Sequence, residues 1–251
     1  MSAARLLLPV LLSLLVCSPA AAQEPSSSTH DRSLRGVGRL SFVVGVPTGA
    51  FRDNIDRLGF GGSVFGGVRL PQIPLVLGAD LGFLVYGRSV DTVPFSGTVG
   101  PRVQVEVVTT NNIVQPHLVL RLQPADGRVR PYLDGLFGFK YLFTETRVRD
   151  EDRFDDDADI ASTTNFRDAT ISGGVGAGLD IRVYRGRPKA DVRSASLHLG
   201  LQYLAGGRAE YLAEGSLEDT NNNGQLDDSE LNIRRSRTPL LQPQIGVTVQ
   251  F

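Results

Sequence analysis

The sequence is poor in cysteine, tryptophan and methionine. Its 251 residues contain no tryptophan, one methionine and a single cysteine, Cys17. Cys17 lies in an N-terminal apolar stretch that we expect to be removed on export, and the preceding Val16 does not suit a lipoprotein signal. The mature chain would then hold no cysteine, which excludes a disulfide framework. Export without disulfides favours a bacterial envelope protein over a small, cross-linked secreted domain.

Long apolar runs are also scarce. The run at 6–16, LLLPVLLSLLV, follows Arg5 and leads to small residues, a pattern that predicts a signal peptide over 1–22, cleaved after Ala22. At about eleven residues this run is too short for a membrane-spanning helix, so a transmembrane anchor is the weaker alternative. Residues 23–35 are polar and are expected to form a disordered periplasmic segment, leaving 36–251 as the folded domain.

The sequence also has no marked excess of charge of either sign. The chain has 26 Lys and Arg against 27 Asp and Glu, a net charge of -1, so no global field attracts nucleic acid. The 28 glycines suit a sheet-rich protein with many tight turns. Because no later run reaches the ~20 apolar residues of a membrane helix, a membrane location would require a closed β-barrel.

Apolar residues alternate with polar or small ones along most of the chain. The final stretch, QPQIGVTVQF, places Ile245, Val247, Val249 and Phe251 on one face, which is typical of the last strand of an outer-membrane barrel. A strand of a soluble β-sandwich is the alternative. Seven earlier segments of about ten residues alternate in the same way, at 37–46, 59–70, 74–87, 113–123, 130–143, 169–184 and 195–207.

These eight segments predict an all-β fold, an antiparallel eight-stranded transmembrane β-barrel. The stretch VQVEVV within 88–112 also alternates, so a ten-stranded barrel is the alternative. Connections at 71–74, 124–128 and 185–193 are short, whereas those at 47–58, 88–112, 145–168 and 208–237 are long. Long loops on one side and short turns on the other indicate that the long loops face the cell exterior.

A set of polar side chains falls on the inward face of the predicted strands. An eight-stranded barrel is just wide enough inside to be filled by side chains. We therefore expect these charges to pair across the lumen and the glycines of the same face to leave room for them. The prediction is a plugged polar core in preference to a continuous pore, built on Asp80, Arg121, Asp134, Lys140, Asp180, Arg182 and Gln202.

The segments GVPTGAF, RPYLDGLFGFKYLF, GAGLDIR and IGVTVQF together resemble the OmpA-like family of small outer-membrane barrels. The resemblance covers nearly the whole chain after the signal. It implies a monomeric or weakly associating barrel, with roles from envelope structure to adhesion and small-solute leakage, and it supplies no catalytic residues. The chain lacks the periplasmic peptidoglycan-binding domain of full OmpA, which puts cell-wall tethering in doubt.

Enzymatic chemistry finds little support in the sequence. Ser196 lies two residues from His198, but no acid can be assigned to the pair from the sequence. The glycine-rich stretch at 173–178 has a dinucleotide-like spacing but lies within a strand pattern with no following helix. We therefore predict a protein that is not an enzyme.

One motif indicates a metal. The stretch DTNNNGQLDDSE at 219–230 matches the twelve-residue EF-hand loop, with Gly224 at the turn position. Its flanks look like strands above the membrane and not like helices, so calcium would act as a structural clip for the external loop 208–237. An ion-free, solvated loop is the alternative. The predicted calcium ligands are Asp219, Asn221, Asn223, Gln225, Asp227 and Glu230.

The sequence as a whole predicts a non-enzymatic barrel of the bacterial outer membrane with a structural or surface-interaction role. A narrow channel or carrier for small or apolar solutes is the alternative. The expected surroundings are outer-membrane lipid and lipopolysaccharide, and the expected state is a monomer that binds no nucleic acid. The acidic tract at 149–159 is interpreted as a solvated loop, with weak divalent-cation binding as a second interpretation.

Overall fold

The computed structural model describes residues 34–94, 104–150, 159–186, 191–217 and 231–251, all within one compact unit, Ser33–Phe251. The predicted signal peptide at 1–22 and residues 23–33 of the predicted periplasmic segment lie outside this described part. Strand pairing begins at Arg35, one residue before the predicted domain boundary. No helix of the described chain has the length and apolarity needed to cross a membrane.

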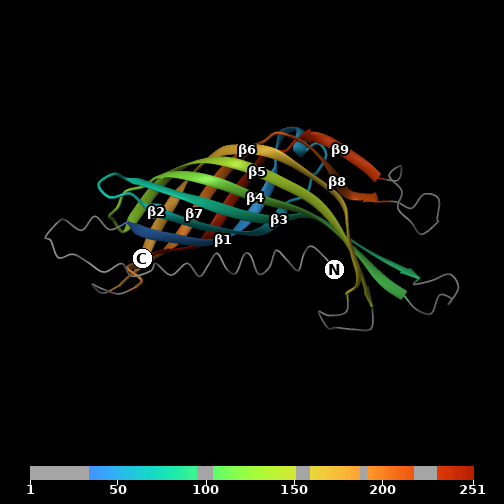
Figure 1. Cartoon of the computed structure of the whole chain (residues 1–251), viewed down its shortest axis with the longest axis horizontal. Coiled ribbons are helices and arrows are strands. Elements are labelled where there is room, and N and C mark those ends of the chain that lie inside the picture. The colour runs from blue at the N-terminus through green and yellow to red at the C-terminus, as the bar shows by residue number, and fades with distance from the viewer. Residues whose placement is uncertain (1–33, 95–103, 151–158, 187–190, 218–230) are drawn as a thin grey trace, which may run out of the picture. The chain divides into compact units, whose positions relative to one another are not determined.

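Eight antiparallel strands close into a barrel, as predicted (Figure 1). Each barrel strand pairs with the barrel strands before and after it in the sequence. The first and last barrel strands pair with each other, which closes the sheet. The barrel strands are β1 (Arg35–Pro47), β2 (Gly59–Arg69), β3 (Leu75–Pro94), β4 (Gln104–Leu122), β5 (Val129–Asp150), β6 (Asp159–Arg185), β7 (Ser194–Gly206) and β10 (Leu240–Gln250).

Two further strands lie outside the barrel. Between β7 and β10 the chain forms a separate two-stranded sheet of β8 (Arg208–Leu217) and β9 (Leu231–Arg237). The strands expected on both sides of the predicted calcium loop are therefore confirmed. The alternative of a ten-stranded barrel is wrong, because residues 88–94 and 104–112 lengthen β3 and β4 and add no barrel strand.

The four strands β3 to β6 are much longer than the others. They run for 19 to 27 residues, against 11 to 13 for β1, β2, β7 and β10. A tilted membrane strand needs about ten residues, so about nine or more residues of each long strand extend past the barrel wall. At about 3.3 Å per residue, each extension is about 30 Å long. These extensions run to the right in Figure 1. Much of the predicted loops 88–112 and 145–168 is thus paired strand, a correction to the expected long loops.

The two ends of the barrel differ in their connections. At one end, here called the short-turn end, the strands are joined by 70–74, 123–128 and 186–193. At the other end, the long-loop end, lie the β3 to β6 extensions, the β8–β9 sheet and a connection holding the 3-10 helix η1 (Gly49–Phe51). This asymmetry places the short-turn end on the periplasmic side.

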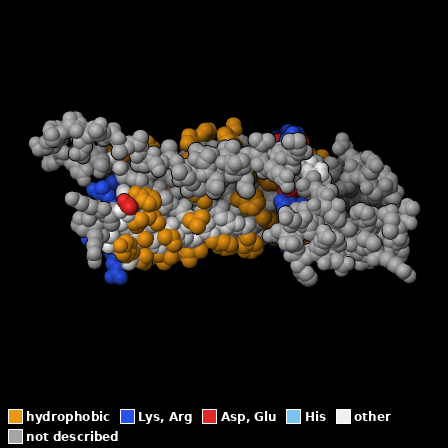
Figure 2. Space-filling view, turned by 60° about the horizontal axis from the view of Figure 1, so that its bottom comes forward, with side chains coloured by type: hydrophobic (Ala, Val, Ile, Leu, Met, Phe, Trp, Pro, Cys, Tyr) orange, Lys and Arg blue, Asp and Glu red, His pale blue; other side chains and the backbone are white. Residues whose placement is uncertain are grey.

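The wall of the barrel has apolar side chains outside and polar ones inside. Figure 2 shows hydrophobic side chains over the outer wall. The outward residues predicted from the alternation are largely solvent-exposed, including Leu118 at 68% and Ile171 at 68%. The buried set instead holds Arg121, Lys140 and Asp180, each at 0% exposure. This inverted distribution is that of a barrel embedded in lipid.

Candidate functional site in the barrel interior

The interior near the short-turn end is built around one arginine. Arg121 on β4 donates from Nε and Nη2 to the two carboxylate oxygens of Asp134 on β5, both at 2.8 Å. The two residues are direct register partners. The guanidinium also lies 3.9 Å from the ring centroid of Tyr132 and 5.2 Å from that of Phe65. A paired charge between two aromatic faces is the arrangement that a buried arginine requires.

A second ion pair joins strands that are not neighbours. Arg39 on β1 donates to Asp80 on β3 at 2.7 Å, passing over β2, and its guanidinium lies 5.1 Å from the Phe65 ring. Phe65 projects inward from β2 between the two arginines. The two pairs thus share one aromatic ring, which ties β1 to β5 through the core.

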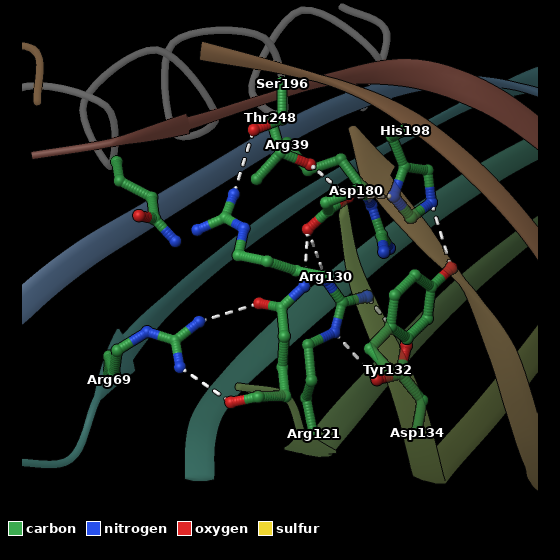
Figure 3. Close-up of polar contacts among 12 residues, drawn as sticks. Arg39, Arg69, Arg121, Arg130, Tyr132, Asp134, Asp180, Ser196, His198 and Thr248 are labelled. Carbon is green, nitrogen blue, oxygen red and sulfur yellow. Dashed lines mark hydrogen bonds and ion pairs between the residues drawn. The ribbon is translucent and has the colours of Figure 1, made fainter. Parts of the chain in front are cut away.

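Asp180 on β6 collects polar contacts from three other strands or their ends (Figure 3). Its Oδ1 accepts a hydrogen bond from Thr248 at 3.2 Å and contacts His198 Nδ1 at 2.9 Å. Its Oδ2 accepts from Gln123 at 2.6 Å and lies 3.9 Å from Arg121 Nη1. A buried carboxylate is stable only when its oxygens accept hydrogen bonds in this way. Asp180 thus links β6 to β7, to β10 and to the end of β4 inside the barrel.

The acid that the sequence could not assign to His198 is Asp180, its register partner on β6. The arrangement is nevertheless not a Ser-His-Asp triad. His198 Nε2 contacts the hydroxyl of Tyr132 at 3.2 Å, and the Ser196 hydroxyl accepts from Arg130 Nη2 at 2.9 Å. In a triad, Nε2 would face the serine. All of these side chains are at most 3% exposed, so the Tyr132–His198–Asp180 chain is packed into the core.

Two glycines make room for Tyr132. A Cβ placed on Gly200 would overlap the Tyr132 hydroxyl oxygen. A Cβ placed on Gly178 would lie 2.7 Å from the Tyr132 ring carbon that carries this hydroxyl. The ring can therefore lie flat against β6 and β7 and stack on His198 with centroids 5.3 Å apart. The prediction that inward glycines leave space for large interior side chains is confirmed here.

Neutral and cationic contacts bridge the barrel interior toward its long-loop end. Gln242 on β10 donates to Gln115 on β4 at 2.9 Å, between strands on opposite sides of the closed sheet. Lys140 on β5 donates to the main-chain carbonyls of Leu204 and Thr238, across β6 and β7. These contacts span the lumen, so its centre is occupied by side chains.

An apolar cluster closes the long-loop end. Phe51 of η1 is fully buried and packs on Tyr86 of β3 and Tyr211 of β8, with ring centroids 6.0 Å and 5.1 Å apart. The Tyr86 hydroxyl donates to the carbonyl of Leu212, and Tyr211 contacts Asn54 through its hydroxyl at 3.0 Å. The β1–β2 connection and the base of the β8–β9 sheet thus form a lid over the barrel mouth.

The structure buries six of the seven predicted inward residues, and leaves Arg182 partly exposed near the end of β6. Sequence reasoning did not name Arg39, Arg69 or Arg130, which are also buried. Their positions on the inward face follow from the same alternation, but Arg69 and Arg130 lie at the ends of segments, where the pattern is weakest.

The six predicted calcium ligands fall within 218–230, outside the described residues. That segment connects Leu217 to Leu231, which are register partners in the β8–β9 sheet. The acidic tract is described only at its ends, where residues 149 and 150 belong to β5 and residue 159 to β6. Among the described residues, no group of three or more His, Cys, Asp or Glu side chains is placed to hold a metal ion.

No protein-family model and no curated protein matches the sequence. Among solved structures, the chain is similar to Neisserial surface protein A (11% identity, 86% of this chain and 95% of that one, TM-score 0.37). It is also similar to a major outer membrane protein of Thermus thermophilus (14%, 86% and 99%, TM-score 0.38). A third is Ail, the attachment invasion locus protein of Yersinia pestis (10%, 87% and 99%, TM-score 0.34). At identities and TM-scores this low, no conclusion about function follows.

The strand pairing and the distribution of side chains establish the setting. A closed sheet has no free edge to leave unpaired in lipid, and its outer wall is apolar while its interior is polar. The protein is therefore a transmembrane β-barrel of the bacterial outer membrane.

Proposed function

We propose that this protein is a non-enzymatic outer-membrane barrel of the OmpA-like kind, which acts through its external surface and not through its lumen. The observation that carries the proposal is the occupied interior. Ion pairs fill the short-turn half, Gln242 and Gln115 bridge the centre, and the Phe51 cluster covers the long-loop mouth. A barrel filled in this way serves as a membrane anchor for what projects from it.

The projecting part supports a surface role. The β3 to β6 extensions form a four-stranded sheet held by main-chain pairing and by side-chain contacts such as Thr109 to Thr146 at 3.0 Å. The β8–β9 sheet is fixed beside them, because Asp168 of β6 accepts a hydrogen bond from the Glu210 main-chain N–H at 2.7 Å. Such a platform holds external loops in defined positions, which suits contact with lipopolysaccharide or another cell-surface partner. We infer that the protein works as a monomer.

Calcium would order the tip of the β8–β9 sheet. Leu217 and Leu231 are register partners, and they lie two residues before Asp219 and one residue after Glu230, the first and last predicted ligands. An EF-hand loop needs its two ends close together, so that the final glutamate can complete the coordination begun by the first aspartate. Asn221 and Asn223, at positions three and five of the loop, lower the ligand charge, which points to weak binding of ~10⁻⁴ to 10⁻³ M.

The alternative, a narrow channel or carrier, makes a contrary prediction for electrical conductance. Recording in planar bilayers separates the two, because a filled barrel gives no steady discrete openings. Light scattering in detergent tests the monomer, which should have the mass of one chain after subtraction of bound detergent.

A further inference from the structure

The barrel interior holds more positive than negative charge. Within the described part of the chain, the buried ionisable side chains include five cationic groups but only three carboxylates. The cationic groups are Arg39, Arg69, Arg121, Arg130 and Lys140, and the carboxylates are Asp80, Asp134 and Asp180. Asp80 is committed to Arg39 and Asp134 to Arg121. Asp180 is satisfied by His198, Gln123 and Thr248. Lys140 donates to two carbonyls at the long-loop end of the barrel, away from this mouth. Arg69 and Arg130 therefore remain as guanidinium groups without a carboxylate.

These two arginines lie together at the periplasmic mouth. Arg69 is the last residue of β2 and Arg130 the second residue of β5, so both border the short-turn end. Arg69 donates to the carbonyl oxygen and to Oε1 of Gln123, whose Nε2 donates to Asp180. Arg130 is the register partner of Asp180. Arg69 thus reaches Asp180 only through Gln123, and neither arginine is in ion-pair range of an acidic side chain within the described part of the chain.

Part of this donor set is unused. Arg130 is 1% exposed, and its Nε has no hydrogen-bond partner, while its Nη2 donates only to the neutral Ser196 hydroxyl. The Nε2 of Gln250, at the end of β10, is also buried and has no partner. The Oε1 of Gln250 accepts a hydrogen bond from the Ser194 hydroxyl at 3.2 Å. A buried guanidinium without a counter-charge is strongly destabilising unless an anion accompanies it.

The rim around this mouth carries the same sign of charge. Exposed arginines stand at the strand ends and turns, namely Arg35, Arg128, Arg185 and Arg193, against two described acids, Asp126 and Asp191. Figure 2 shows this gathering of blue side chains at the short-turn end, to the left. A cationic rim around a low-dielectric opening concentrates anions there.

We propose that the periplasmic mouth of the barrel is a binding site for a phosphate group, held by Arg69 and Arg130. Arginine forks match the geometry of phosphate oxygens and can donate two parallel hydrogen bonds each. The group could belong to the headgroup of an inner-leaflet phospholipid, which lies at the same depth as the rim, or to free inorganic phosphate. The site is independent of the external loops and of the surface role.

The test has one arm for each source. Isothermal titration of the refolded protein with inorganic phosphate, in an uncharged detergent, measures the free anion. Native mass spectrometry of the protein extracted from membranes detects retained phospholipid. The double variant R69Q/R130Q removes the two guanidinium groups. Arg52→Gln removes an exposed arginine at the opposite, long-loop end and is the matched control. Heat-modifiable migration on gels checks that every variant is folded.

The expected result is binding in at least one arm, weakened about tenfold or more by R69Q/R130Q, a change of about 1.4 kcal/mol, and changed less than about twofold by R52Q. Loss of retained lipid in the double variant identifies a headgroup, whereas phosphate binding without retained lipid identifies the free anion. Equal binding by the native protein and R69Q/R130Q, or no binding of either ligand by the native protein, overturns the proposal. If the double variant does not fold, Arg130→Lys keeps the charge and removes the Nε donor. Weaker binding by R130K than by R52Q then supports the site, and unchanged binding refutes it.

Discussion

Arg121 and Asp134 face each other across neighbouring strands and share two hydrogen bonds of 2.8 Å, with neither side chain exposed to solvent. Each residue is thus both the register partner and the counter-charge of the other. The pair is the centre of the polar core, because Tyr132 and Phe65 pack on the guanidinium and Asp180 lies 3.9 Å from it.

The first prediction concerns this pair. Asp134→Asn leaves the Arg121 charge buried without its partner, so we expect the free energy of unfolding to fall by about 3–5 kcal/mol. Replacement of both residues by apolar ones of similar size, as in R121M/D134L, should cost clearly less, since no lone charge remains. Urea titration of the refolded barrel in lipid vesicles measures both. Glu145→Gln, at the partly exposed pair with Arg147, is the control and should cost less than about 1 kcal/mol.

The second prediction concerns the space that Tyr132 occupies. Gly200→Ala places a methyl group against the Tyr132 hydroxyl, and we expect a loss of about 1–3 kcal/mol from overpacking. Tyr132→Phe removes that hydroxyl, so the double variant should be more stable than the sum of the two single changes predicts. Gly66→Ala is the control, because a Cβ there meets no atom within 4 Å. Strict additivity in this cycle would show that Gly200 does not serve Tyr132.

The third prediction concerns the apolar wall. Leu118 is 68% exposed on the outside of β4 and faces lipid in the membrane. Leu118→Arg should cost about 2–4 kcal/mol of folding free energy in a bilayer if it lies near the midplane. Ile233→Arg, on β9 beyond the barrel, places the same group in water and should change stability by less than about 0.5 kcal/mol. Similar costs at the two positions would contradict the assignment of the wall to the membrane and of β9 to its exterior.

The fourth prediction concerns calcium. Titration of the refolded protein with Ca²⁺ should give heat at one weak site, with a dissociation constant of ~10⁻⁴ to 10⁻³ M. Asp219→Ala and Glu230→Ala should each abolish most of this heat, because they remove the first ligand and the bidentate last one. Asp228→Ala, which lies in the same segment but at no ligand position, should leave the heat nearly unchanged. Equal heats from the native protein and all three variants would contradict calcium binding by this segment.

The barrel was predictable because its signal is local. Alternation along each strand fixes which residues face outward, and Leu118 and Ile171 lie where the alternation places them. The full length of β3 to β6 was not recovered. The alternation of VQVEVV indicated a strand within 88–112, but the following TTNN carries polar side chains on both faces. Only the cross-strand pairing, as between Val105 and Asp150, shows that this strand continues β4 and forms no separate hairpin.

The interior contacts were predictable in kind and not in detail. Asp180, Asp134 and Arg121 could be assigned to the lumen from sequence, but the choice of partner depends on strand register and barrel closure. His198 meets Asp180 only because β6 and β7 pair in one register, and Gln242 meets Gln115 only because the sheet is closed. Arg69 and Arg130 were missed because they stand at strand ends, where alternation gives way to turn sequences.

The central claim is that side chains fill the barrel and leave its function to the external surface. Single-channel recording in planar bilayers tests this claim most directly, with the native protein compared to a variant whose core is opened, such as F51A/Q115A/Q242A. We expect no steady discrete openings for the folded native protein at moderate voltage, and a higher frequency of openings for the opened variant. Steady, discrete openings of the native barrel at a reproducible conductance would contradict it and would favour the channel.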